Sequence, residues 1–172
     1  MKLLIYIIAA FPYILFSLDR LPPEQFSDWN VIAENNVWIG WRQYDGFPWC
    51  RAKSTFNAPA AEIMAILEDK QNYSNIFKRV ESARILTDDI VYISLDMPFP
   101  FSSRDYVVSY SQDQDGEDII YRFHAVDHPD GQLNDGYVRL VNAAGEWRLH
   151  PITINSTELS YTWNGELRGD FP

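Results

Sequence analysis

The sequence predicts an α+β domain in which one long antiparallel β-sheet dominates. First, two strand-like segments precede a helical segment, and about six further strand-like segments follow it, an order typical of α+β folds rather than of alternating βαβ units. Second, several of these segments alternate apolar and polar residues and end in turn residues. Third, the 172 residues are 47% hydrophobic, enough for one domain with a sizeable core, and no internal repeat is visible.

The composition disfavours some classes of partner. A formal net charge of −10 would repel a phosphate backbone, so nucleic acid is not expected as a partner, and anionic membrane surfaces are disfavoured for the same reason. The aromatic content of 15% suits a large curved sheet or a roomy apolar pocket, and it suits ordinary core packing equally well. The single cysteine, Cys50, excludes an internal disulfide and is expected to be a small buried thiol.

No motif for catalysis, a cofactor or a metal is visible. The sequence has no nucleophile elbow, phosphate loop, dinucleotide fingerprint or zinc-binding pattern. His124 and His128 are four residues apart, but the first falls on an expected strand and the second in a loop, so they do not share a helix face. We therefore expect no catalytic residue, no metal and no cofactor.

The N-terminal segment, residues 1–20, resembles a targeting sequence. An apolar run from Leu3 to Leu18 follows the single positive charge of Lys2, as in a secretory signal peptide. The run is short for a spanning helix and contains Pro12. We expect a signal peptide; the alternatives are an uncleaved membrane anchor, which would allow membrane association, and a buried helix of the domain. The expected location is exported, periplasmic or membrane-anchored, and the domain itself is expected over residues 21–172.

The first elements of the domain form a hairpin. Residues 26–34 are mixed and suggest a short helix leading into a strand. A strand is expected over 37–42 and its return strand over 49–56. Between them, Asp45-Gly46 is a strong signal for a tight hairpin turn.

A helical pair is expected next. Asn57 is a good N-cap, and Pro59 falls in the first turn, where its missing N–H is not needed. The helix should run to about Asp69 with an apolar stripe formed by Ala60, Ile63, Ile66, Leu67 and Met64. A second short helix is expected over 73–78.

The remaining segments predict strands. They alternate in polarity and are separated by turn residues, among them Asp113 to Gly116 and Ala144-Gly145. The expected strands cover residues 82–86, 90–97, 104–110, 119–126, 136–142, 146–154 and 158–167.

The most informative stretch is 91–110, two strands joined at a corner that contains Pro98 and Pro100. Because strand side chains alternate, Tyr92 and Asp96 share a face before the corner. After it, one face carries Arg104, Tyr106, Val108 and Tyr110. The mixture of aromatic and polar groups is typical of a wall between a core and a ligand cavity, although a sheet with a wet outer face would also show it.

Three polar residues of this stretch have competing interpretations. Asp96 on an enclosed face would need a partner or a raised pKa, and otherwise it lies in water at the strand end. Arg104 and Asp105 are adjacent on a strand, so they point to opposite faces. Each is therefore expected to pair with a different neighbour as a structural anchor.

Several motifs, in order, resemble a known family. Residues 99–107 (FPFSSRDYV) are similar to a proline-then-Arg-Asp-aromatic-Val signature, and residues 145–151 (GEWRLHP) to a Gly-x-Trp-x-x-x-Pro segment. Residues 157–163 and 168–172 are similar to the strand and loop that follow. On these motifs the chain resembles, over about 26–172, a bacterial-type START (steroidogenic acute regulatory protein-related lipid transfer) domain of the Bet v 1-like, or SRPBCC, helix-grip superfamily.

The resemblance implies a helix-grip fold, in which a curved antiparallel sheet grips a long C-terminal helix around an apolar tunnel for one lipid or other small hydrophobic molecule. The implied activity is binding, carriage, transfer or sensing without catalysis. The alternative within the superfamily is an aromatase/cyclase-type enzyme that uses the same cavity. The expected ligand-binding residues are Asp96, Tyr106 and Tyr110, followed by Tyr92, Trp147, Tyr161 and Trp163.

The sequence departs from the family pattern at two points. Sterol-carrying members place a carboxylate where Asp96 lies and an arginine where this chain has Tyr110, so recognition of a sterol by that pair is in doubt. Asp96 is left to bond Tyr110 or another cavity group. In addition, the sequence stops at Pro172, where the grip helix would start. We expect a C-terminally truncated domain; otherwise a dimer partner, the N-terminal apolar run or a bound lipid covers the sheet.

Overall fold

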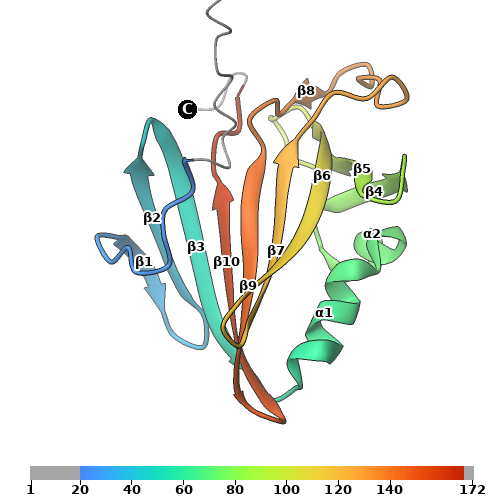
Figure 1. Ribbon diagram of the computed structural model, residues 1–172. Coiled ribbons are helices and arrows are strands. Elements are labelled where there is room, and N and C mark those ends of the chain that lie inside the picture. The colour runs from blue at the N-terminus through green and yellow to red at the C-terminus, as the bar shows by residue number, and fades with distance from the viewer. Residues whose placement is uncertain (1–19, 169–172) are drawn as a thin grey trace, which may run out of the picture.

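The computed structural model describes residues 20–168, which form one ten-stranded sheet with the helices on one of its faces (Figure 1). The strand order is β1-β2-β3-β10-β9-β7-β6-β5-β4, and all these pairs are antiparallel, while β8 pairs with β6 in parallel. The expected α+β fold with one long antiparallel sheet is confirmed. The strands are β1 (Asn30–Glu34), β2 (Trp38–Tyr44), β3 (Phe47–Phe56), β4 (Val80–Ile85), β5 (Ile90–Leu95), β6 (Arg104–Asp115), β7 (Asp118–Ala125), β8 (Val138–Arg139), β9 (Ala144–Thr153) and β10 (Ser156–Asn164).

The predicted hairpin between β2 and β3 is present. Asp45 and Gly46 both have positive φ, 45° and 87°, which is the backbone of a tight turn that matches the twist of the two strands. The turn aligns Trp41 with Cys50 across the pair.

The last strand, β10, joins the two parts of the sheet. β10 lies between β3 and β9, so the N-terminal hairpin and the later strands become one sheet only when β10 is in place. Figure 1 shows β10 in the centre of the sheet, between β9, the strand before it in the sequence, and β3 of the N-terminal hairpin. Trp163, for example, faces Cys50 of β3 on one side and Gly145 of β9 on the other.

The helical segment covers one face of the sheet. It comprises α1 (Ala60–Glu68), a 3₁₀ turn (Lys70–Asn72) and α2 (Tyr73–Ile76). The buried side chains of α1 are Ile63, Met64 and Leu67, which pack with apolar residues of β5 to β7 and β9. Two details of the prediction are wrong: Ile66 is 49% exposed, and the N-cap residue is Pro59 rather than Asn57.

Several strand boundaries also differ from the prediction. Residues 26–29 form no helix, and only Val138–Arg139 of the segment 136–142 are in a strand. Ala144-Gly145, predicted as a turn, belongs to β9, where a Cβ on Gly145 would lie 2.5 Å from the Thr162 carbonyl oxygen. This glycine therefore permits a close strand approach rather than a turn.

The predictions for the two chain ends concern residues largely outside the described part. The expected signal peptide or anchor covers residues 1–20, of which 1–19 are not described, and the loop motif 168–172 is described only at Arg168. Between residues 20 and 168 no C-terminal grip helix is present after β10. No helix in that range is long and apolar enough to span a membrane.

Candidate functional site

A cavity of about 270 Å³ lies on the face of the sheet that carries the helices. It is bounded by α2, by the strands β4 to β7, β9 and β10, and by the segments before β9 and after β10. Most of its lining residues are aromatic or aliphatic. They are Tyr73, Phe77, Arg79, Val80, Ile93, Leu95, Tyr106, Tyr110, Phe123, Leu140, Ala143, Ala144, Trp147, Tyr161, Trp163, Asn164 and Leu167.

Stacked aromatic rings form one wall of the cavity. Trp147 of β9 and Tyr161 of β10 are directly opposite each other in the antiparallel pair, and their ring centroids are 3.6 Å apart with planes inclined by 8°. Trp163 follows Tyr161 by two residues, so it projects from the same face, and its ring stacks on Tyr161 at 4.8 Å. The strand register thus creates a flat aromatic surface.

The cavity also contains four phenol groups, which differ in their hydrogen bonding. The Tyr73 hydroxyl donates to the Leu67 carbonyl oxygen at 2.5 Å, and burial raises the pKa of Tyr73 to about 12. Burial is also the largest cause that raises the pKa of Tyr110, and the neighbouring Tyr73 and Tyr106 raise it further.

Tyr106 and Tyr161 lie deep in the domain but keep accessible surface, because that surface faces the cavity. Within residues 20–168 neither hydroxyl makes a hydrogen bond. Burial, the largest cause, raises the pKa of both phenols, and the effect of nearby tyrosines adds to it. Both groups are therefore neutral and able to donate a hydrogen bond into the cavity at any physiological pH.

The other polar lining residues are few. Asn164 makes two hydrogen bonds within the protein: its Nδ2 donates to the Asn142 carbonyl at 3.0 Å and its Oδ1 accepts from the Glu166 N–H at 2.9 Å. Arg79 lines the cavity and is exposed to solvent, which places it at the rim. Among the lining residues in the described part of the chain there is no Asp, Glu, His or Cys.

Of the seven residues predicted to bind ligand, five line the cavity: Tyr106, Tyr110, Trp147, Tyr161 and Trp163. Tyr92 does not. It lies on the opposite face of β5, where its hydroxyl accepts a hydrogen bond from Asn134 Nδ2 at 2.8 Å and its ring lies 5.3 Å from the guanidinium of Arg84. The register of β5 and β6 explains this, because it pairs Ile93, not Tyr92, with Tyr106, and paired residues share a face.

Asp96 is also outside the cavity lining. It is exposed just beyond the end of β5, and its backbone N–H donates to the Arg79 carbonyl at 2.9 Å. Tyr110 is buried among aromatic rings that include Tyr73 and Tyr121. The two residues are therefore not brought together, and the predicted contact between Asp96 and Tyr110 is not made.

Arg104 and Asp105 contact different parts of the chain on opposite faces of β6. Arg104 donates from Nε to the Leu167 carbonyl at 3.0 Å, from Nη2 to the Arg168 carbonyl at 2.8 Å, and also to the Ser102 carbonyl. The fully buried Asp105 carboxylate accepts two hydrogen bonds from Arg139, at 2.7 and 3.0 Å.

The sequence analysis missed several lining residues. Tyr73 and Phe77 belong to the helical segment, and their apolar character was the only available signal. Leu140 and Leu167 come from irregular segments, where no periodicity indicates which way a side chain points.

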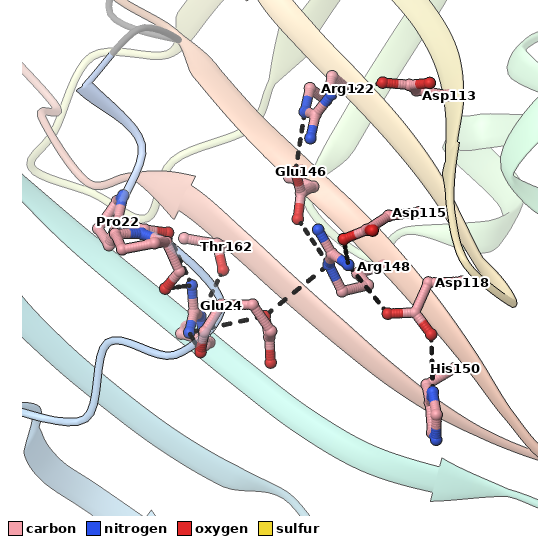
Figure 2. A network of polar contacts seen from close by, with 12 residues as sticks. Pro22, Glu24, Asp113, Asp115, Asp118, Arg122, Glu146, Arg148, His150 and Thr162 are labelled. Carbon is pink, nitrogen blue, oxygen red and sulfur yellow. Dashed lines mark hydrogen bonds and ion pairs between the residues drawn. The ribbon is translucent and has the colours of Figure 1, made fainter.

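A second hollow, of about 450 Å³, lies on the outer face, the sheet face opposite the cavity. Its charged lining residues pair with one another: Arg148 bonds Glu146 and Asp115, and Arg122 bonds Glu146 at 2.8 Å. Arg148 donates from Nη1 to Asp118 at 2.9 Å, and Asp118 lies 2.7 Å from Nδ1 of His150. Figure 2 shows these three side chains next to one another. This hollow is larger than the cavity but polar and internally compensated, so it is the weaker candidate for a ligand site.

The same network fastens residues 20–25, the N-terminal strap, across the outer face. The buried Arg51 guanidinium donates to the carbonyls of Pro22, Pro23 and Glu24 at 3.0 to 3.2 Å and to the Thr162 hydroxyl at 2.7 Å. Burial, the largest effect, lowers the pKa of Arg51. Nearby Glu24 opposes that shift. The polar groups of the outer face therefore have a structural role, because they hold the N-terminal strap against the sheet.

Comparisons with known proteins agree with this architecture. No protein-family model matches the chain. An uncharacterized protein of Pseudomonas aeruginosa is 24% identical over 152 residues, which are 84% of this chain and 75% of that protein.

Solved structures are similar over most of the chain. The crystal structure of a STAR-related lipid transfer protein from Xanthomonas axonopodis is 24% identical, with a TM-score of 0.73 over 85% of this chain and 86% of that one. Human StAR-related lipid transfer protein 5 is 19% identical, with a TM-score of 0.68 over 87% and 77% of the two chains. With the sheet order and the helical segment described above, these similarities show that the described part of the chain has a START-like fold.

Proposed function

We propose that this protein binds one hydrophobic molecule, a lipid, in the cavity between the sheet and α2, for carriage, transfer or sensing. The observation that carries the proposal is the cavity of about 270 Å³ with a predominantly aromatic and aliphatic lining. Ligand sites are characteristically concave, mostly apolar and provided with a few placed polar groups. The names of the similar Xanthomonas and human proteins, both lipid transfer proteins, support the same class of ligand.

The apolar lining of the cavity supplies the affinity for the ligand. Each ligand CH₂ group that moves from water into the cavity contributes on the order of 0.8 kcal/mol. The stacked rings of Trp147, Tyr161 and Trp163 offer a broad surface at low conformational cost, because each of these side chains is already held by its neighbour.

Binding is a better fit to this lining than catalysis. An aromatase/cyclase-type reaction needs general acids and bases whose pKa values lie near the working pH. The described lining has no Asp, Glu, His or Cys, and burial raises the pKa of the Tyr106 and Tyr161 phenols away from neutrality. These groups can orient a ligand but are poorly suited to transfer protons.

The test is mass spectrometry of organic extracts and of the intact protein under native conditions. We expect a co-purified lipid at about one molecule per chain, and displacement of the neutral fluorescent probe N-phenyl-1-naphthylamine by added lipid. A protein that carries no lipid and binds no apolar probe would contradict the proposal. Turnover of a polyketide mimic would instead favour the enzymatic alternative.

We also propose that the full chain is exported or membrane-anchored in a bacterial cell. The support is the apolar N-terminal segment of the sequence behind Lys2. The test is fractionation of cells that express the chain with and without residues 1–20. We expect the protein without this segment to appear in the cytoplasmic fraction. An unchanged distribution would contradict this proposal.

A further inference from the structure

We infer that the ligand is an uncharged amphiphile that enters the cavity with its oxygen-bearing end first and accepts hydrogen bonds from Tyr106 and Tyr161. This inference rests on the proposed function, since it names the class of molecule that the same cavity takes.

The first argument is the state of the two hydroxyl groups. Tyr106 and Tyr161 line the cavity from β6 and β10, and neither hydroxyl makes a hydrogen bond within residues 20–168. Tyr73, in the same cavity, differs because its hydroxyl is already bonded to the Leu67 carbonyl oxygen. The cavity therefore offers two donors that the protein itself does not use.

The second argument is the penalty for covering these donors. A pure hydrocarbon in the cavity would displace water from both hydroxyls and leave them unpaired, which is unfavourable for a buried polar group. A ketone, ester or alcohol oxygen at the inner end of the ligand accepts hydrogen bonds from these hydroxyls, which a hydrocarbon cannot do. A phenol donor also favours one class of ligand, because a site that hydrogen-bonds a ligand oxygen discriminates against an analogue without that oxygen.

The third argument concerns charge. The only charged residue among the described lining residues is Arg79, and it lies at the solvent-exposed rim. A carboxylate carried into the interior would lose its hydration and meet no buried cation. The inner end of the ligand is therefore uncharged, and the aromatic wall beside Tyr161 contacts the adjoining apolar part.

Competitive displacement of N-phenyl-1-naphthylamine from the full-length protein tests this inference. The competing probes are dodecanol, a methyl ketone of matched chain length, dodecane and dodecanoate. We expect the alcohol and the ketone to bind more tightly than dodecane and dodecanoate. Tyr106→Phe and Tyr161→Phe should each weaken binding of the ketone by about fivefold, the loss of one neutral hydrogen bond. Each should also strengthen binding of dodecane, because the penalty for covering that hydroxyl disappears.

Two controls separate ligand recognition from structural damage. Tyr44→Phe removes a phenol hydroxyl on β2, in a ring pair with Phe26 and outside the cavity lining, and should leave all four affinities unchanged. The urea midpoints of Tyr106→Phe and Tyr161→Phe should equal or exceed that of the wild type, since no partner in the described chain loses a hydrogen bond.

The inference is overturned if both phenylalanine variants bind the ketone like the wild type, or if dodecanoate binds more tightly than the alcohol and loses that advantage in Arg79→Gln. In either case the wild type still binds an apolar probe, so the proposed function stands. If the wild type binds neither N-phenyl-1-naphthylamine nor any competitor, the proposed function fails and the inference fails with it.

Discussion

Arg104 holds Leu167 in the wall of the cavity. Arg104 of β6 is only 1% exposed and donates from Nε to the Leu167 carbonyl at 3.0 Å, while Leu167 is one of the lining residues. The neighbouring Gly165 N–H bonds the Pro48 carbonyl at 2.6 Å. The segment after β10 is thus fixed at two points, and the end of the cavity depends on it.

Replacing Arg104 should loosen this segment. In Arg104→Lys the charge remains, but one ammonium group cannot reproduce the hydrogen bonds to the carbonyls of both Leu167 and Arg168. We expect a loss of about 2 kcal/mol in the free energy of unfolding, and faster amide hydrogen exchange at Gly165. Arg42→Lys, at a solvent-exposed pair with Asp28, is the control and should change little. Unchanged exchange at Gly165 would show that Arg104 does not hold the segment.

The Asp105–Arg139 pair should make a large and non-additive contribution. Arg139→Met removes both hydrogen bonds to a carboxylate that is 0% exposed, so an uncompensated charge remains in the interior. We expect destabilisation of about 3 to 5 kcal/mol in urea unfolding. Asp105→Asn combined with Arg139→Met should be more stable than the sum of the single effects predicts. Simple additivity would mean that the two groups do not act as a pair.

Filling the cavity should block binding without unfolding the domain. Ala143 lines the cavity from the segment before β9 and is only partly buried, so the larger side chain of Ala143→Leu can extend into the existing space. We expect probe binding to fall at least about tenfold, the equivalent of 1.4 kcal/mol, with a urea midpoint near that of the wild type. Ala33→Leu on β1 is the matched control. Retained binding in Ala143→Leu would place the ligand elsewhere.

The contact between His150 and Asp118 predicts how stability depends on pH. The hydrogen bond to Asp118 raises the pKa of His150 above its ordinary value of 6.5. Burial alone would raise the pKa of Asp118, but hydrogen bonds from His150 and Arg148 outweigh it, and the pKa falls below 3.8. The His150 contribution is therefore complete below pH 6.5 and is lost as the pH rises through its raised pKa. The Asp118 contribution is present above pH 3.8 and is lost as the pH falls through its lowered pKa.

Urea unfolding of the wild type and of His150→Gln at pH 5.5 and 8.5 checks this expectation. The wild type should be the more stable protein at pH 5.5, and the difference should shrink at pH 8.5. The exposure of the His150 side chain, 55%, keeps the effect small. Asp118→Asn should remove the pH dependence of the difference. A difference that is the same at both pH values would show that the imidazolium does not contribute.

Local patterns were sufficient for most of the elements but not for all of the site. The Asp45-Gly46 turn and the helical segment after Pro59 were predicted because their signals lie within a few residues of each other. Tyr92 was assigned to the cavity because its face of β5 carries an aromatic ring and polar groups, yet the aliphatic face with Ile93 and Leu95 is the one that lines the cavity. The pairing of Ile93 with Tyr106 decides which face is the inner one.

The sequence by itself determined the α+β layout, the hairpin, the likeness to a START domain and five of the residues that line the cavity. These features follow from period-two alternation, turn chemistry and short motifs, which act over neighbouring residues. Only the tertiary structure decided that Tyr92 and Asp96 lie outside the cavity, that Trp147 stacks on Tyr161, and that Leu140 and Leu167 close its wall. The physical reason is that strand register and the docking of irregular segments depend on contacts between distant parts of the chain, which no local pattern encodes.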